Sequence, residues 1–282
     1  MEPREWSLVV FTVLMQACVG AFLLNLWLRE RSKDSGVPHD RVEFVLIPVA
    51  ILAMLASLAH LGRPLYALNS LLNLGSSWLS REIFFTGAFV ALLVVAVLLR
   101  RNPRLQRSVE YVVAAAGIAC IASMASIYTH AVKPAWEGFY TYVAFGATAL
   151  LAGTALTAGV LAVTGQRDEG LARDLKDLSW VAIVVALAEV VVLPLYLVSL
   201  ASGDPAAQAT AGLLAGPYAP WLLLRWVLLL GGGVVPLVMV LRRAADGPAP
   251  ASLVYLAGIA IIAGEVVGRY LFYATAIPTG IG

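Results

Sequence analysis

Long apolar segments alternate with short polar segments along the whole chain. A helix needs roughly 20 apolar residues to cross a bilayer core of about 30 Å. Segments of that length with few charges predict eight transmembrane helices, near residues 5–28, 41–61, 80–100, 109–130, 141–164, 178–201, 217–241 and 251–273. The pattern therefore predicts an all-α integral membrane protein, in which residues 1–282 form a single transmembrane helical domain.

The longest connection on the side of the termini, residues 62–79, keeps a helical apolar pattern of its own. Its leucines are interleaved with Asn69, Ser70 and Asn73, which predicts a short amphipathic helix lying in the membrane interface. Glycine and serine at residues 75–77 are expected to end it, and Ser80 is expected to cap the next helix.

Composition agrees with a membrane protein and excludes other classes. Hydrophobic residues make up 61% of the chain, charged residues make up 13%, and the net charge is only +2, so a basic surface for nucleic acid is not expected. Cys18 and Cys120 lie within apolar segments and lack metal-ligand spacing, so we predict buried thiols and no metal site. The N-terminus has no cleavage-site pattern, and the first span is expected to stay in the membrane.

Basic residues predict the orientation. Lysine and arginine accumulate in short cytoplasmic loops. Thirteen of the 19 lie near the connections after the first, third, fifth and seventh predicted spans, against four on the opposite side and two within spans. With an even number of spans, both termini are predicted to face outward, to the periplasmic side.

Polar candidates for chemistry gather near that outer boundary. Ionisable side chains at membrane depth are costly and are functional candidates by default. The second span ends in HLGRP, with His60 and Arg63, and the third begins on the same boundary with Glu82. Tyr128 and Arg269 lie in the outward halves of the fourth and eighth spans. These residues are therefore candidates for one site at the outer face.

Structural explanations exist for the same residues. Glu82 lies close to a predicted helix N-terminus, where it would answer the helix dipole, and Arg63 could extend to lipid headgroups. Two carboxylates could each neutralise a buried arginine, Glu265 with Arg269 and Glu189 with Arg225.

The candidate residues at the outer face have the chemistry that oxidation of a quinol requires. That reaction releases two protons and two electrons, so it needs proton acceptors that titrate near neutrality. His60 could accept from or hydrogen-bond one hydroxyl, Glu82 could pass a proton to the outer water, and Arg63 could hold the carboxylate. A haem would need two axial ligands, and the only histidines in spans, His60 and His130, both lie at the outer edge, so no haem is expected.

Residues 60–83, HLGRPLYALNSLLNLGSSWLSREI, resemble the signature stretch of the membrane-anchor subunit of dimethyl sulfoxide reductase. The opening REWSLVVFTVLMQACVGAF and the closing GEVVGRYLFY resemble the ends of the same family. The resemblance implies a menaquinol-oxidising anchor without haem in a bacterial cytoplasmic membrane. It also implies two partners, an electron-transfer subunit with four iron-sulfur clusters and a catalytic subunit with a molybdenum–molybdopterin cofactor.

By position, the resemblance implies that the quinol-site histidine is His60, its neighbouring glycine is Gly62 and the acidic residue is Glu82. Arg63 is not a dependable part of the family pattern, so its role rests on the local argument. Tyr128 and Arg269 complete our set of candidate quinol-binding residues. A structural anchor without a quinol site and a secondary transporter are the alternatives, although a transporter should show paired repeats and interrupted helices near the midplane.

Overall fold

Eight membrane-crossing helices form the protein. The computed structural model describes residues 3–31, 37–60, 69, 71–163, 169–243 and 250–280, with the backbone alone for residues 3–5 and 60. Within these ranges all regular elements are helical, and eight helices are long and apolar enough to cross a membrane, which confirms the predicted fold class. The long helices are α1 (Pro3–Arg31), α2 (Asp40–His60), α3 (Trp78–Leu98), α4 (Pro103–Thr129), α5 (Phe139–Val163), α6 (Glu169–Ala201), the continuous segment α8–η4–α9 (Ala219–Trp226, Val227–Val234, Val235–Arg243) and α10 (Ala251–Ala274).

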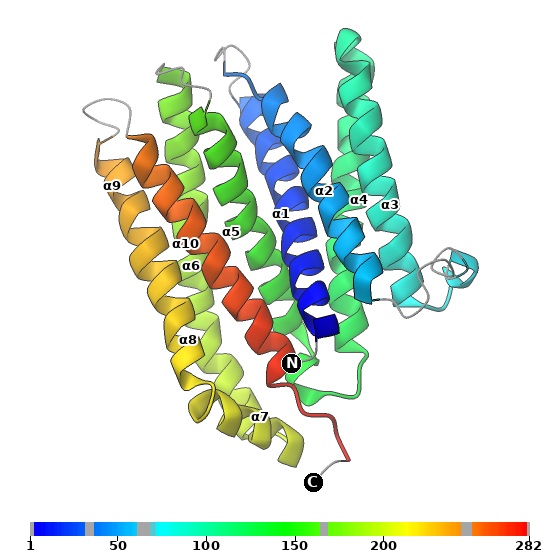
Figure 1. The fold of residues 1–282 in the computed structure, drawn as a ribbon, viewed down its shortest axis with the longest axis vertical. Helices are drawn as coiled ribbons and strands as arrows, with labels where there is room; N and C mark the ends of the chain where they lie inside the picture. The colour runs from blue at the N-terminus through cyan, green and yellow to red at the C-terminus, as the bar shows by residue number, and fades with distance from the viewer. Residues whose placement is uncertain are drawn as a thin grey trace.

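Helix α1 lies in the middle of the bundle and is the most enclosed span (Figure 1). It packs against α2 and α5, while α3 and α4 pair on one side and α10 packs on α5 and on η4 on the other. Small residues permit the closest approach, because the backbone of α1 at Gly20 touches that of α5 at Gly153. A central helix surrounded by protein explains why Met15 and Phe22 are fully buried.

Both ends of the described chain lie at one end of the bundle (Figure 1). The C-terminal ends of α1, α3, α5 and α9 lie at the opposite end, and the basic residues gather there, as the sequence predicted. We call this the basic end and the other the terminal end. Which membrane side each end faces stays a prediction.

Buried ion pairs connect four helices at the basic end. Arg29 of α1 pairs with Glu43 of α2 at 3.1 Å and also with Glu110 of α4. Nearby, His39 Nδ1 lies 3.0 Å from Asn25 Oδ1, and His39 Nε2 lies 3.3 Å from Asp174 Oδ2 of α6. These carboxylates are buried within the protein and do not face solvent. The pairs therefore hold the helices in their relative positions.

The structure differs from the predicted elements at α6 and α7, and it describes only part of the predicted interfacial helix. Helix α6 begins at Glu169, nine residues before the predicted span, because its polar first turns bury Asp174 and Leu175 against neighbouring helices. A short helix that the sequence did not predict, α7 (Pro205–Ala215), follows α6 and is capped by Asp204. The predicted interfacial helix falls mostly outside the described residues, and residues 71–73 form one 3₁₀ turn.

A π-helical turn interrupts the seventh span. Pro236 has no backbone N–H to donate toward the preceding turn, and η4 ends just before it, at Val234. In this segment Gly232 and Gly233 lie against Ala260 and Ile261 of α10, where a larger side chain would clash. The irregular turn is thus tightly packed against the C-terminal helix that carries the site described next.

Candidate functional site

Glu82 is a buried carboxylate near the terminal end of the bundle. The predicted cap was wrong: α3 begins at Trp78, and the Ser77 side chain accepts the hydrogen bond from the Ser80 N–H at 3.3 Å. Glu82 therefore lies in the second turn, only 7% exposed, rather than at the helix N-terminus. Because the free N–H groups of a helix end with its first turn, the dipole explanation for Glu82 loses its basis.

Glu82 lies near titratable side chains of two other helices. Its carboxylate lies within electrostatic range of Cys120, Tyr128 and Tyr273, on α4 and α10. Among the described residues, none forms a hydrogen bond or ion pair with it. A buried carboxylate without a fixed partner is unusual, since burial of such a group costs free energy. It has oxygen atoms available for a ligand.

Tyr128 and Tyr273 form the polar centre of an aromatic cluster next to Glu82. Their hydroxyl oxygens lie 2.8 Å apart. Tyr128 packs against Trp136 with ring centroids 5.0 Å apart, and the Trp136 indole N–H donates to the Phe272 carbonyl at 2.7 Å. The cluster joins α4 and α10, so the Tyr128 hydroxyl is held in one place within electrostatic range of Glu82.

Three predicted site residues cannot be placed relative to this cluster. His60 is the last residue of α2, and its side chain lies outside the described residues, as do Gly62 and Arg63. The backbone does bring the end of α2 and the start of α3 to the same end of the bundle (Figure 1). Another histidine at that end, His130, directs Nδ1 toward the Ser126 carbonyl at 2.8 Å and packs against Trp78.

The charged side chains of α6, α8 and α10 confirm one of the two predicted ion pairs and contradict the other. Glu189 and Arg225 form the predicted ion pair, with Arg225 Nη2 donating to Glu189 Oε1 at 2.7 Å. The predicted pairing of Glu265 with Arg269 is wrong. Glu265 instead lies 3.4 Å from Arg225 and accepts from Thr148 Oγ1 at 2.5 Å. A shared helical face did not decide the pairing, because the neighbouring helix supplies a cation that reaches Glu265.

Arg269, the remaining predicted quinol-binding residue, forms no hydrogen bond or ion pair with Glu82, although both act electrostatically on Tyr128 and Tyr273. It is 3% exposed, and its Nη2 donates to Gln16 Oε1 at 2.7 Å and to Thr148 Oγ1 at 3.2 Å. Its guanidinium carbon lies 3.8 Å from the centre of the Phe145 ring. Sequence reasoning missed Gln16 and Thr148, although a polar residue inside an apolar span is a detectable signal.

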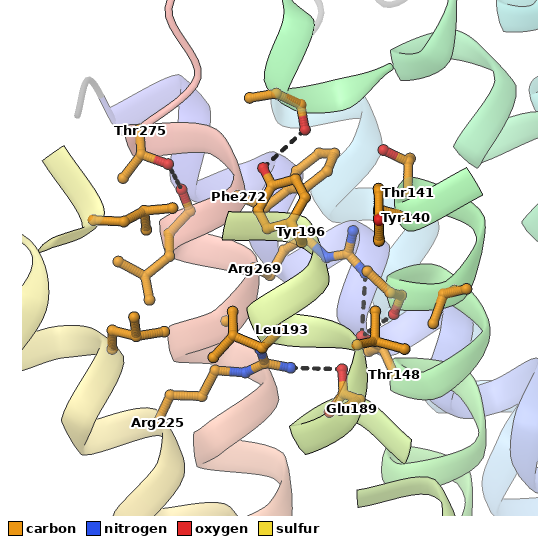
Figure 2. A pocket seen from close by; sticks show the side chains of 18 of the residues that line it. Tyr140, Thr141, Thr148, Glu189, Leu193, Tyr196, Arg225, Arg269, Phe272 and Thr275 are labelled. Atoms are coloured by element: carbon orange, nitrogen blue, oxygen red, sulfur yellow. Dashed lines mark hydrogen bonds and ion pairs between the residues drawn. The ribbon is translucent and has the colours of Figure 1, made fainter. Parts of the chain in front are cut away.

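A cavity of about 130 Å³ opens among α5, α6, α8 and α10 (Figure 2). Arg225, Arg269, Glu189 and Glu265 contribute to its wall, together with apolar side chains. Neither Tyr128 nor Glu82 lines it. Phe145 links the two regions, because its ring contacts Arg269 and also lies 5.5 Å from the Tyr128 ring.

The two regions together offer proton acceptors, hydroxyl groups and guanidinium donors in an apolar setting. Within the described part of the chain, no three His, Cys, Asp or Glu side chains converge as a metal site would require. The region around Glu82 can exchange hydrogen bonds and protons with a small ring compound, and the cavity can hold a ring-sized group.

Comparisons with known proteins identify the family. The sequence profile described as DMSO reductase anchor subunit (DmsC) matches residues 1–275. The anaerobic dimethyl sulfoxide reductase protein YnfH of Escherichia coli is 32% identical over 284 residues, which cover 99% of this chain and 97% of the relative. The C subunit of anaerobic dimethyl sulfoxide reductase from E. coli is 28% identical with the same coverage, and its counterpart from Haemophilus influenzae is 33% identical over 58% of this chain and 61% of its own length. With eight apolar spans and a match over nearly its whole length, this multi-pass membrane protein belongs to the family of dimethyl sulfoxide reductase anchor subunits.

Proposed function

We propose that this chain oxidises menaquinol at a site formed by His60, Gly62, Arg63 and Glu82, with Tyr128 beside it. The electrons pass to an iron-sulfur subunit and then to a molybdenum-containing catalytic subunit in the bacterial cytoplasmic membrane. Membership in an anchor-subunit family supports the assembly. The observation that carries the site is the buried Glu82 carboxylate, which has no partner among the described residues and lies near the Tyr128–Tyr273 pair.

The proposed reaction is a two-proton, two-electron oxidation. Menaquinol loses two protons and two electrons and becomes menaquinone. His60 accepts one proton and Glu82 accepts the other, and each releases it to water at the terminal end. The two electrons leave through the iron-sulfur subunit. Tyr128 is held by Tyr273 and can hydrogen-bond a ring oxygen, while Arg63 holds the Glu82 carboxylate after proton release.

The partner should dock at the terminal end, because an iron-sulfur cluster must come close to the quinol. We propose that the loops at residues 62–79 and 131–140 form this surface. Of the aromatic residues in the second loop, Trp136 is buried against Phe272 and is part of the protein core. Phe139 is 75% exposed and Val132 is 69% exposed, so these two are the better candidates for contact with a partner.

The test is menaquinol-dependent turnover of the assembled complex. His60→Ala and Glu82→Gln should each lower it by about 100- to 10,000-fold, the usual contribution of a general acid or base. An artificial donor that feeds the catalytic subunit directly should still drive acceptor reduction in both variants, which shows that the complex has assembled. His130→Ala is the matched control at the same end of the bundle, and it should retain the parent rate.

The alternatives predict other results. A purely structural anchor would lose no turnover in either variant as long as the complex assembles. If the chain were a secondary transporter, electron transfer would not use these residues, and neither variant would change menaquinol turnover. Parent-like menaquinol turnover in both His60→Ala and Glu82→Gln would therefore overturn the proposed site.

A further inference from the structure

Arg269 is a buried cation whose hydrogen bonds are incomplete. In the described part of the chain no carboxylate lies within ion-pair distance of it, because Glu265 pairs with Arg225. Its Nη2 is used by Gln16 and Thr148, whereas Nε and Nη1 have no hydrogen-bond partner. An isolated guanidinium at membrane depth is costly unless its donors are satisfied. The side chain is therefore arranged for an acceptor that the described residues do not supply.

The wall of the cavity combines polar and apolar side chains. Figure 2 shows Arg225 pointing at Glu189, and the Arg269 side chain near Phe272 and Thr148. Half-exposed Val192 and Leu222 also line the cavity.

The size of the cavity limits what can enter. Its volume is about 130 Å³, and a protein cavity of about 150 Å³ holds one benzene molecule. One six-membered ring, the quinone ring, therefore fits, and the fused second ring of a naphthoquinone extends between the half-exposed residues toward lipid. A phospholipid headgroup with its glycerol would not fit without repacking of the wall.

We propose that this cavity is a second ring-binding site, separate from the site at His60 and Glu82, and that it holds the ring of a quinone. Arg269 Nε and Nη1 are covered by neighbouring side chains in the free protein, so the guanidinium turns toward the cavity on binding and donates to a ring carbonyl oxygen. The Oε2 atom of Glu189 is buried and has no partner among the described residues, and once uncovered by the same movement it accepts from a hydroxyl when the ring is reduced. The choice of a quinone as the occupant rests on the proposed function, while the presence of a binding site rests on the geometry alone.

Radiolabelled menadione, the naphthoquinone ring without its tail, is the probe, and the purified complex freed of its native quinone is the sample. The parent should bind two molecules per complex and His60→Ala should bind one. Val192→Trp fills the cavity and should also bind one. Val191→Trp is the matched control: Val191 neighbours Val192 but is 66% exposed and does not line the cavity, so this variant should bind two.

A second variant tests the donor directly. Arg269→Lys keeps the positive charge but removes the forked donors, so affinity at the cavity should fall by roughly 10-fold or more, the usual effect of losing hydrogen bonds to a charged donor. Reduction of the acceptor with an artificial donor confirms that each variant complex is assembled.

Two results would overturn the inference. One is equal menadione binding in Val192→Trp and Val191→Trp. The other is native mass spectrometry in which Val192→Trp loses an anionic phospholipid rather than a quinone. Neither result depends on the turnover of His60→Ala, and that turnover tests the proposed function separately. Conversely, parent-like turnover in His60→Ala with one menadione lost in Val192→Trp would reject the proposed quinol-oxidising site and retain the cavity.

Discussion

The contact between α1 and α5 allows a sharp test of the packing. A Cβ added at Gly153 would lie 2.5 Å from the Gly20 carbonyl carbon and 2.6 Å from the Ala21 nitrogen. Atoms in optimal contact lie about 3.5–4.0 Å apart, so Gly153→Ala requires the two helices to separate by roughly 1 Å. Both neighbours are backbone atoms of the central helix, which no change of rotamer can move aside.

The expected cost follows from this overlap. Overpacking in a well-packed core typically costs about 1–3 kcal/mol, which exceeds the gain of about 0.8–1 kcal/mol that alanine offers over glycine within a helix. Gly153→Ala should therefore be destabilising. Gly159→Ala on the same helix is the matched control: its Cβ would meet no atom within 4 Å, so this variant should be neutral or slightly more stable than the parent.

Thermal unfolding of the purified protein in detergent, followed by circular dichroism, measures the difference. A change of 1 kcal/mol corresponds to roughly 2–4 °C in a protein of this size. The apparent Tm of Gly153→Ala should fall by several degrees while that of Gly159→Ala stays at or above the parent value. If Gly153→Ala melts no lower than Gly159→Ala, the close approach of α1 and α5 is wrong.

Two further predictions concern charge. Arg225→Met leaves the carboxylates of Glu189 and Glu265 without their cation and should cost about 3–5 kcal/mol, seen as loss of assembled protein in membranes; Glu189→Gln keeps a hydrogen-bond acceptor for Arg225 and should cost less. Equal yields of the two variants would contradict this. Reporter fusions after residue 104 should report cytoplasm and those at the C-terminus the periplasm, and the reverse pattern would refute the orientation.

Much of the fold was predictable because span length and charge distribution are local properties of a sequence. Apolar runs of about 20 residues marked eight helices, and the described residues contain eight such spans. Boundaries were predicted less well. Helix α6 begins at Glu169 because tertiary contacts bury Asp174, a residue that composition alone would assign to water. The 11 residues of α7 are too few to give a membrane-spanning signal.

The candidate site was predictable only in part. The sequence located Glu82 near a helix start, but the tertiary structure decided that it is buried, within electrostatic range of Tyr128 and Tyr273. The i, i+4 spacing of Glu265 and Arg269 suggested a pair, which Arg225 of the adjacent helix replaced. Spacing along one helix cannot report which side chain a neighbouring helix brings close.

Sequence by itself determined the number of spans, the end at which basic residues gather and the family. The lateral order of the helices, the central place of α1 and the cavity beside Arg269 were decided only by tertiary structure. The physical reason is that lipid tails and buried faces are equally apolar, so hydropathy shows that a helix enters the membrane and not which neighbour it chooses. That choice depends on small residues such as Gly20 and Gly153 and on buried charge pairs, whose partners lie far apart in sequence.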